Sequence, residues 1–143
     1  MKLDLPEAAL DTLKQHSKAG REAWKNGDLC AAEENFVSAW AAIPEPKKNY
    51  DYAQSIASGL VVFFRDTNQI QKAKKWLEVM RQMYSSPTDD YVEFTAATVH
   101  FESGDLDLAF AIFDKQFKNF KNRPFDGEDK KYLEFYKKRA AGG

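Results

Sequence analysis

A chain of 143 residues is long enough for one domain with a substantial core and too short for a second. Hydrophobic residues make up 43% of it and aromatic residues 14%, which indicates a folded globule and excludes a disordered chain. Because Cys30 is the single cysteine, the composition also excludes an internal disulfide and a metal site built from several thiolates.

The net charge of −1 is unevenly distributed along the chain. Residues 1–113 carry 12 lysines and arginines against 17 acidic residues, a net charge of −5. Residues 114–143 carry 9 against 5, a net charge of +4. General nucleic-acid binding needs a broad positive surface, so this distribution argues against it. We expect the basic end to be the solvated face of a C-terminal helix.

The N-terminal sequence MKLDLPEAALDTLK has acidic residues at Asp4 and Glu7 and no apolar run, so it does not resemble a signal peptide. The longest apolar run, residues 60–64, is far too short to span a bilayer. These features predict a cytoplasmic protein that makes no membrane contact.

Apolar residues recur at helical spacing throughout the chain. Pro6 suits the start of the first helix, Gly27 suits a left-handed turn that stops it, and Asp28 suits the cap of the next helix. Prolines and polar turns bound the later segments. Further helices are predicted at residues 29–42, 48–65, 69–84, 106–120 and 128–139, and another that starts between residues 88 and 90 and ends at 104.

One segment of the chain is repeated. Residues 29–36 reappear at 70–77 and 106–113, with alanine each time at the same place, and GDLCAAEENF against GDLDLAFAIF is the clearest match. The three alanines are 41 and 36 residues apart, slightly above the ~34 residues of a tetratricopeptide helix pair. The three alanines are Ala32, Ala73 and Ala109.

These repeats resemble the tetratricopeptide (TPR) family over about residues 13–120. The first pair matches the family best, through Gly20, Ala32, Phe36, Ala39 and Pro44. The resemblance implies an all-α, TPR-like α–α superhelix of three helix pairs. A C-terminal capping helix completes a single domain over 1–139, followed by a flexible tail at 140–143.

The second and third pairs depart from the family pattern. Val61 replaces a small residue where two helices cross, Asn68-Gln69 replaces Gly-Asp, and Met80 and Gln116 replace alanines. A small residue at such a crossing lets two backbones approach closely, and a larger one there typically costs about 1–3 kcal/mol.

The residue types that catalysis or metal binding would need do not form a known motif. The sequence contains no glycine-rich phosphate loop and no histidines at metal-binding spacing. The run His100-Phe101-Glu102 imitates a zinc deaminase, but the required Cys-x-x-Cys is absent. We expect His16 and His100 to be satisfied at helix junctions and Cys30 to be a small packed residue. The sequence therefore predicts a protein that is not an enzyme and has no cofactor.

In stacked helix pairs, the first helix of each pair lines an inner face. Arginine mixed with aromatic residues is typical of protein interfaces, although these aromatics could equally belong to the core. Arginine is rarely buried, so Arg21→Ala and Arg65→Ala are expected to weaken partner binding with little loss of stability. The predicted partner-binding residues are Ser17, Arg21, Trp24, Ser58, Val62, Arg65, Tyr91, Phe94, Thr98 and Phe101.

The ending RPFDGEDKKYLEFYKKR is similar to the closing helix of small bacterial TPR-like immunity proteins that accompany polymorphic toxins. The resemblance implies a binder that neutralises a toxin, and the acidic body suits a basic toxin domain. The alternative is a scaffold or adaptor that holds a peptide or helix of a partner in its groove. The Lys/Asn pattern with which some TPR proteins clamp a C-terminal carboxylate is not matched by Ser17 and Arg21, so a chaperone-tail adaptor is disfavoured.

Overall fold

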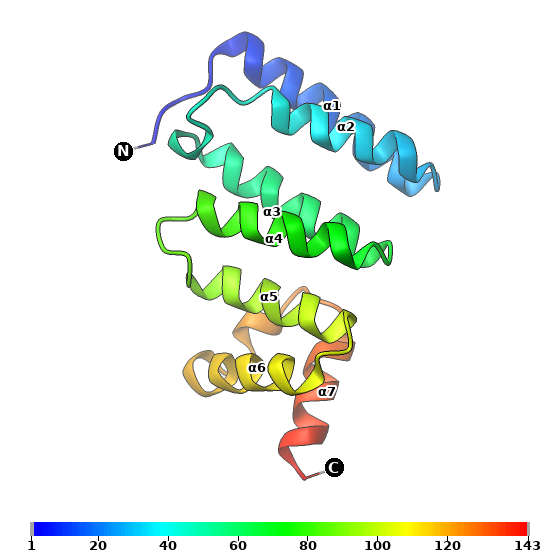
Figure 1. The fold of residues 1–143 in the computed structure, drawn as a ribbon, viewed down its shortest axis with the longest axis vertical. Helices are drawn as coiled ribbons and strands as arrows, with labels where there is room; N and C mark the ends of the chain where they lie inside the picture. Colours follow the sequence, from blue (N-terminus) through cyan, green and yellow to red (C-terminus); the bar gives the residue numbers. More distant parts are fainter. Residues whose placement is uncertain (1, 143) are drawn as a thin grey trace.

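The computed structural model describes residues 2–142, and all regular secondary structure in that range is helical (Figure 1). The predicted all-α class is confirmed. Within this range lie seven α-helices and two short 3-10 turns. They are α1 (Glu7–Lys25), α2 (Leu29–Ala41), η1 (Lys47–Asn49), α3 (Asp51–Asp66), α4 (Ile70–Met83), α5 (Asp90–Glu102), α6 (Leu106–Phe120), η2 (Arg123–Phe125) and α7 (Lys130–Ala140).

Consecutive helices pack as hairpins, α1 with α2, α3 with α4 and α5 with α6. The hairpins follow one another along the long axis of the molecule, and α7 runs steeply across the direction of the other helices at the C-terminal end (Figure 1). This order places the first helix of each hairpin beside the corresponding helices of its neighbours.

The three hairpins turn through the same backbone geometry. Gly27 and Gly104 have φ of 82° and 86°, the left-handed region in which glycine meets no steric penalty. Asn68 occupies the corresponding place in the second hairpin with φ of 60°. Asparagine tolerates this region better than most residues, so the second hairpin makes its turn without glycine.

Small residues mark the points where the paired helices touch. The three repeat alanines of α2, α4 and α6 are each 0% exposed. Gly20 of α1 lies against the ring of Phe36 on α2, and a Cβ atom at Gly20 would lie 2.5 Å from Phe36 Cε1. The first hairpin can therefore close only because position 20 has no side chain.

The core has three clusters of buried residues, two of which are rich in aromatic rings. In the first, Phe63 of α3 meets Trp24 edge-on at 5.1 Å and Phe36 at 5.2 Å between ring centroids. In the second, Tyr132 of α7 is 0% exposed and lies 6.0 Å from the ring of Phe113 on α6. The first cluster joins the first two hairpins to α5, and the second joins α5 and α6 to α7.

Two predicted helix starts were early by a few residues. Residues 47–49 form the turn η1, in which the Lys47 ammonium donates to the carbonyls of Trp40 and Ile43 at 3.0 and 2.5 Å and so satisfies the end of α2. Helix α7 begins after Asp129, whose carboxylate accepts the N–H of Lys131 at 3.0 Å as a cap.

The expected flexible tail at 140–143 is only partly within the described residues. Ala140 is the last residue of α7, and Gly143 lies outside the described range, as does Met1 of the expected domain.

Gly20→Ala and Gly59→Ala are expected to change stability in opposite directions. The new methyl at position 20 would overlap Phe36, whose ring is held by Trp24 and Phe63, at a cost of about 1–3 kcal/mol that exceeds the gain of about 1 kcal/mol from removing a helical glycine. A methyl at position 59 meets nothing within 4 Å, so that variant keeps the gain. Urea denaturation measures the free energy of unfolding of both variants. A Gly20→Ala variant as stable as Gly59→Ala would contradict the close contact between Gly20 and Phe36.

Candidate protein-binding surface

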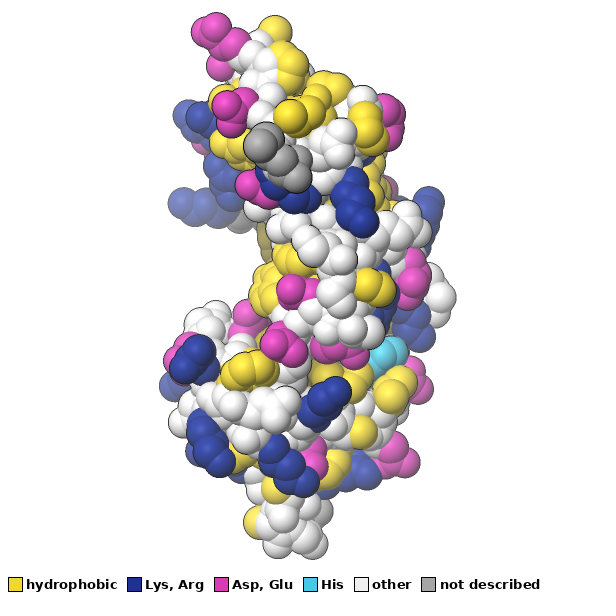
Figure 2. All heavy atoms as spheres, turned by 90° about the vertical axis from the view of Figure 1, so that its left-hand side faces the viewer, with side chains coloured by type: hydrophobic (Ala, Val, Ile, Leu, Met, Phe, Trp, Pro, Cys, Tyr) yellow, Lys and Arg dark blue, Asp and Glu magenta, His cyan; other side chains and the backbone are white. Residues whose placement is uncertain are grey.

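The first helices of the hairpins enclose a largely apolar hollow of about 290 Å³. Figure 2 shows the outline of the molecule curving inward between the two ends of the stack, with hydrophobic side chains at the recess. Six of the ten predicted binding residues lie in its wall, on α1, α3 and α5. The lining residues are Ser17, Arg21, Trp24, Phe36, Ile56, Ser58, Gly59, Leu60, Val62 and Tyr91.

The hollow has a rigid floor and an accessible rim. Trp24 is half-buried, and its ring is fixed edge-on against Phe36 and Phe63, so it belongs both to the core and to the wall. Arg21 is exposed at the rim, and Tyr91 is 46% exposed on the opposite side. An apolar floor with an arginine and two amphipathic aromatics is the composition of a protein-binding hot spot.

Three of the four binding residues predicted on α5 are wholly or partly buried. Phe94 is 2% exposed and packs on Phe113 and Phe125 at 5.4 and 5.0 Å between ring centroids, while Thr98 is 0% exposed. Phe101 is half-buried against α7, 5.4 Å from the ring of Tyr132. Phe94 and Phe101 face the second core cluster and Thr98 contacts Arg65, so Tyr91 is the one predicted α5 residue that is exposed.

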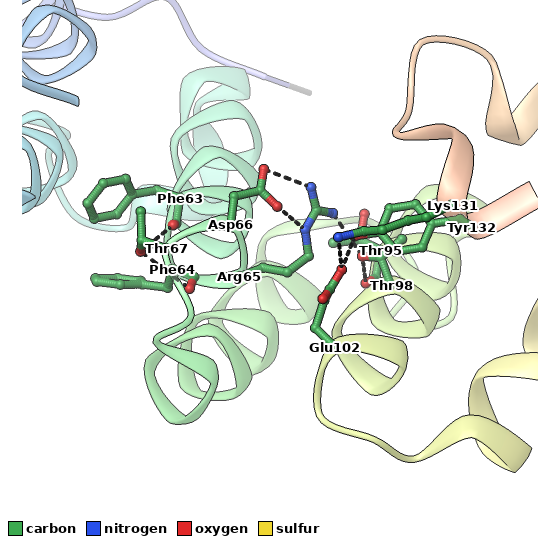
Figure 3. Close-up of polar contacts among 10 residues, drawn as sticks. All are labelled: Phe63, Phe64, Arg65, Asp66, Thr67, Thr95, Thr98, Glu102, Lys131 and Tyr132. Atoms are coloured by element: carbon green, nitrogen blue, oxygen red, sulfur yellow. Dashed lines mark hydrogen bonds and ion pairs between the residues drawn. The ribbon is translucent and has the colours of Figure 1, made fainter. Parts of the chain in front are cut away.

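Arg65 was expected at the surface and is 8% exposed. Figure 3 shows its guanidinium between Asp66 and Thr98. Its Nε and Nη1 donate to Asp66 at 2.8 Å and to Thr98 Oγ1 at 2.9 Å. Its guanidinium lies 5.6 Å from the ring centroid of Tyr132, at cation–π range. The expectation that Arg65 is exposed is corrected: Arg65 ties α3 to α5 and α7.

The same network holds α7 in place. Tyr132 donates to Glu102 at 2.8 Å, and Lys131 pairs with that carboxylate at 2.6 Å. Burial alone would lower the pKa of Arg65, but the hydrogen bond to Asp66 and the nearby negative charges raise it above its ordinary value. The guanidinium therefore stays charged within the network.

Two more hollows adjoin the first. One of about 400 Å³ shares Tyr91 with it, and one of about 560 Å³ shares Val62 with it and Glu128 with the second. We call these three hollows together the inner surface. The second is lined by Asp90, Tyr91, Phe94, Gln116, Phe120, Arg123, Pro124, Asp126 and Glu128, and the third by Val62, Arg65, Asp66, Asn68, Glu102, Gly127, Glu128, Asp129 and Lys131.

Sequence reasoning missed the acidic part of the inner surface. Asp126 and Glu128 are explained well enough by their position just before α7, where the helix dipole favours negative charge. The signal for a second role is that these acidic residues lie in the basic C-terminal segment, residues 114–143, against its net positive charge. Phe36, Ile56 and Leu60 also line the hollow and are not among the predicted binding residues.

The three residues singled out for reactivity have different surroundings. His16 Nδ1 is 2.9 Å from Asn35 Oδ1, so this histidine is satisfied at the α1–α2 junction as expected. His100 Nδ1 is buried with no hydrogen-bond partner among the described residues, and burial lowers the pKa of that ring. Cys30 is exposed rather than packed, because residue 30 lies on the opposite side of α2 from the buried Ala32.

Residues 2–142 contain no group of three or more histidine, cysteine, aspartate or glutamate side chains placed to hold a metal ion. In the same range, none of the helices combines the length and the apolar character needed to cross a membrane. Comparison with known protein families, with curated proteins and with solved structures gives no match for this chain.

Arg65→Ala is expected to lower the free energy of unfolding by about 2 kcal/mol, because it removes charge-assisted hydrogen bonds and leaves a gap between three helices. Arg21→Ala is the matched control and should stay within about 0.5 kcal/mol of the parent protein, since Arg21 is exposed and makes no ion pair in the described part of the chain. Urea or thermal denaturation compares them, and equal stability of the two variants would contradict the assigned role.

Proposed function

We propose that this chain is a non-catalytic protein-binding module whose inner surface receives part of a partner protein. The observation that carries the proposal is the apolar hollow between α1, α3 and α5, which brings Arg21, Trp24 and Tyr91 together from distant parts of the sequence. Partner side chains that fill such pockets supply most of the binding energy in protein complexes.

The size of the hollow supports a protein segment as its occupant. The hollow of about 290 Å³ is large enough for one anchoring side chain. The hollow opens onto two larger neighbours, so an anchoring side chain can enter it while the rest of the segment continues across the inner surface.

We further propose that the three hairpins form a TPR-like α–α superhelix closed by α7. Support comes from the repeated alanines, each 0% exposed where its hairpin closes, and from the shared left-handed turns. In such a stack the first helices line the inner side, which is where α1, α3 and α5 enclose the hollow.

For the biological role, we propose an inhibitor that binds and neutralises one partner, of the kind represented by bacterial immunity proteins against cognate toxins. The resemblance of the closing helix supports this role. The alternative is a scaffold or adaptor that holds a peptide or helix of its partner, which the segment-sized hollow favours. An inhibitor forms one tight complex, whereas an adaptor recovers several partners through short segments.

Val62→Asp is expected to abolish partner binding, because it places a charge in the apolar hollow. Val37→Asp makes the same change on α2, where Val37 is 37% exposed and outside the hollow, and should bind like the parent protein. Affinity capture from the source cells with the three proteins, followed by mass spectrometry, makes the comparison.

Equal recovery of partners by Val62→Asp and the parent protein would overturn the assignment of the hollow. A partner recovered in one-to-one ratio is then produced in a host with and without this chain. Protection of the host from growth arrest supports the inhibitor, and an equal effect on growth in both cases removes it.

A further inference from the structure

The apolar hollow continues into an acidic region of the inner surface. Tyr91 separates it from the second hollow, whose lining includes Asp90, Asp126 and Glu128. Val62 separates it from the third hollow, which Glu128 also lines. A partner segment that places one side chain in the first hollow and continues into either neighbouring hollow therefore passes close to carboxylates.

Not every charge on the inner surface is available to a partner. In the third hollow, Asp66 forms an ion pair with Arg65 at 2.8 Å, and Glu102 forms one with Lys131 at 2.6 Å. Asp90, Asp126 and Glu128 make no ion pair within residues 2–142, and they are opposed by one uncommitted cation, Arg123. Arg21 of the first hollow also makes no ion pair within residues 2–142, so these three carboxylates face two unpaired cations and the uncommitted charge around the apolar hollow is negative on balance.

Glu128 lies at the meeting point of the second and third hollows and is half-buried. Burial raises its pKa; the charge of Arg65 works in the other direction and that of Asp66 adds to the rise. The carboxylate is thus partly desolvated without a cation of its own, and a positive group supplied from outside would stabilise its ionised form.

We infer that the partner segment recognised by the inner surface carries a large apolar side chain next to lysine or arginine side chains. The apolar side chain fills the hollow between Trp24 and Tyr91, and the basic groups lie over Asp126 and Glu128. This inference rests on the proposed protein-binding function and specifies the chemistry of its partner. The charges act mainly on selectivity and on the rate of association, since rim charges steer encounter more than they add affinity.

The test selects peptides from a phage-displayed random library on the immobilised full chain and measures their dissociation constants by fluorescence anisotropy. Selected peptides should combine a bulky apolar residue with lysine or arginine. The double substitution Asp126→Asn with Glu128→Gln should weaken them about tenfold at low salt, and less at high salt. The control Asp11→Asn with Glu34→Gln makes the same charge change at exposed residues outside the three hollows and should change binding less than twofold.

The Val62→Asp variant distinguishes a failure of the basic-partner inference from a failure of the proposed protein-binding function. One outcome overturns the inference of a basic partner and leaves the protein-binding function standing. In that outcome the selected peptides lose binding to Val62→Asp, but they are acidic or bind the Asp126→Asn/Glu128→Gln protein unchanged. Failure to select any peptide whose binding depends on Val62 overturns both. Circular dichroism melting curves of all variants confirm that each is folded.

Discussion

The close contact between α1 and α2 sets the geometry on which the rest of the molecule depends. Because Gly20 has no side chain, the ring of Phe36 can lie directly on the α1 backbone and reach Phe63 of the next hairpin. Trp24 then fits beside the same ring and becomes part of the wall of the hollow. One missing side chain thus determines both how the first two hairpins pack and the shape of the surface between them.

The position of α7 decides which part of α5 remains available. Tyr132 and its neighbours cover the face of α5 that carries Phe94 and Phe101, while Tyr91 one turn earlier stays exposed. The segment that leads into α7 places Glu128 at the border of two hollows. The closing helix therefore limits the apolar part of the inner surface, and the segment before it contributes to the acidic part.

Local patterns were sufficient to predict the helices and several of their contacts. The bounds of α6 were predicted as observed, and so were the turn at Gly27 and the burial of Ala32. Helical spacing and glycine geometry depend on neighbouring residues, which is why they can be recognised in one sequence. The second hairpin turn was less obvious, since Asn68 takes the conformation that glycine takes elsewhere.

Contacts between distant segments could not be predicted in this way. Arg65 is buried because Thr98, 33 residues away, accepts its hydrogen bond and Tyr132 lies beside it. Nothing in the spacing around Arg65 indicates either partner, and the general rule that arginine is exposed gave the wrong expectation. The expectation that Cys30 is packed was wrong for a simpler reason: the side of α2 that carries Cys30 faces away from the other helices.

Tyr91 stands between an apolar hollow and an acidic one and is exposed enough to be replaced without disturbing the core. A partner that occupies both hollows must span the width of the Tyr91 side chain. Recognition therefore depends on the order and spacing of the partner's residues as well as on their types. Exchanging Tyr91 for a smaller or larger residue would alter that required spacing while the helices stay as they are. Related chains could diverge in what they recognise by changing a single position.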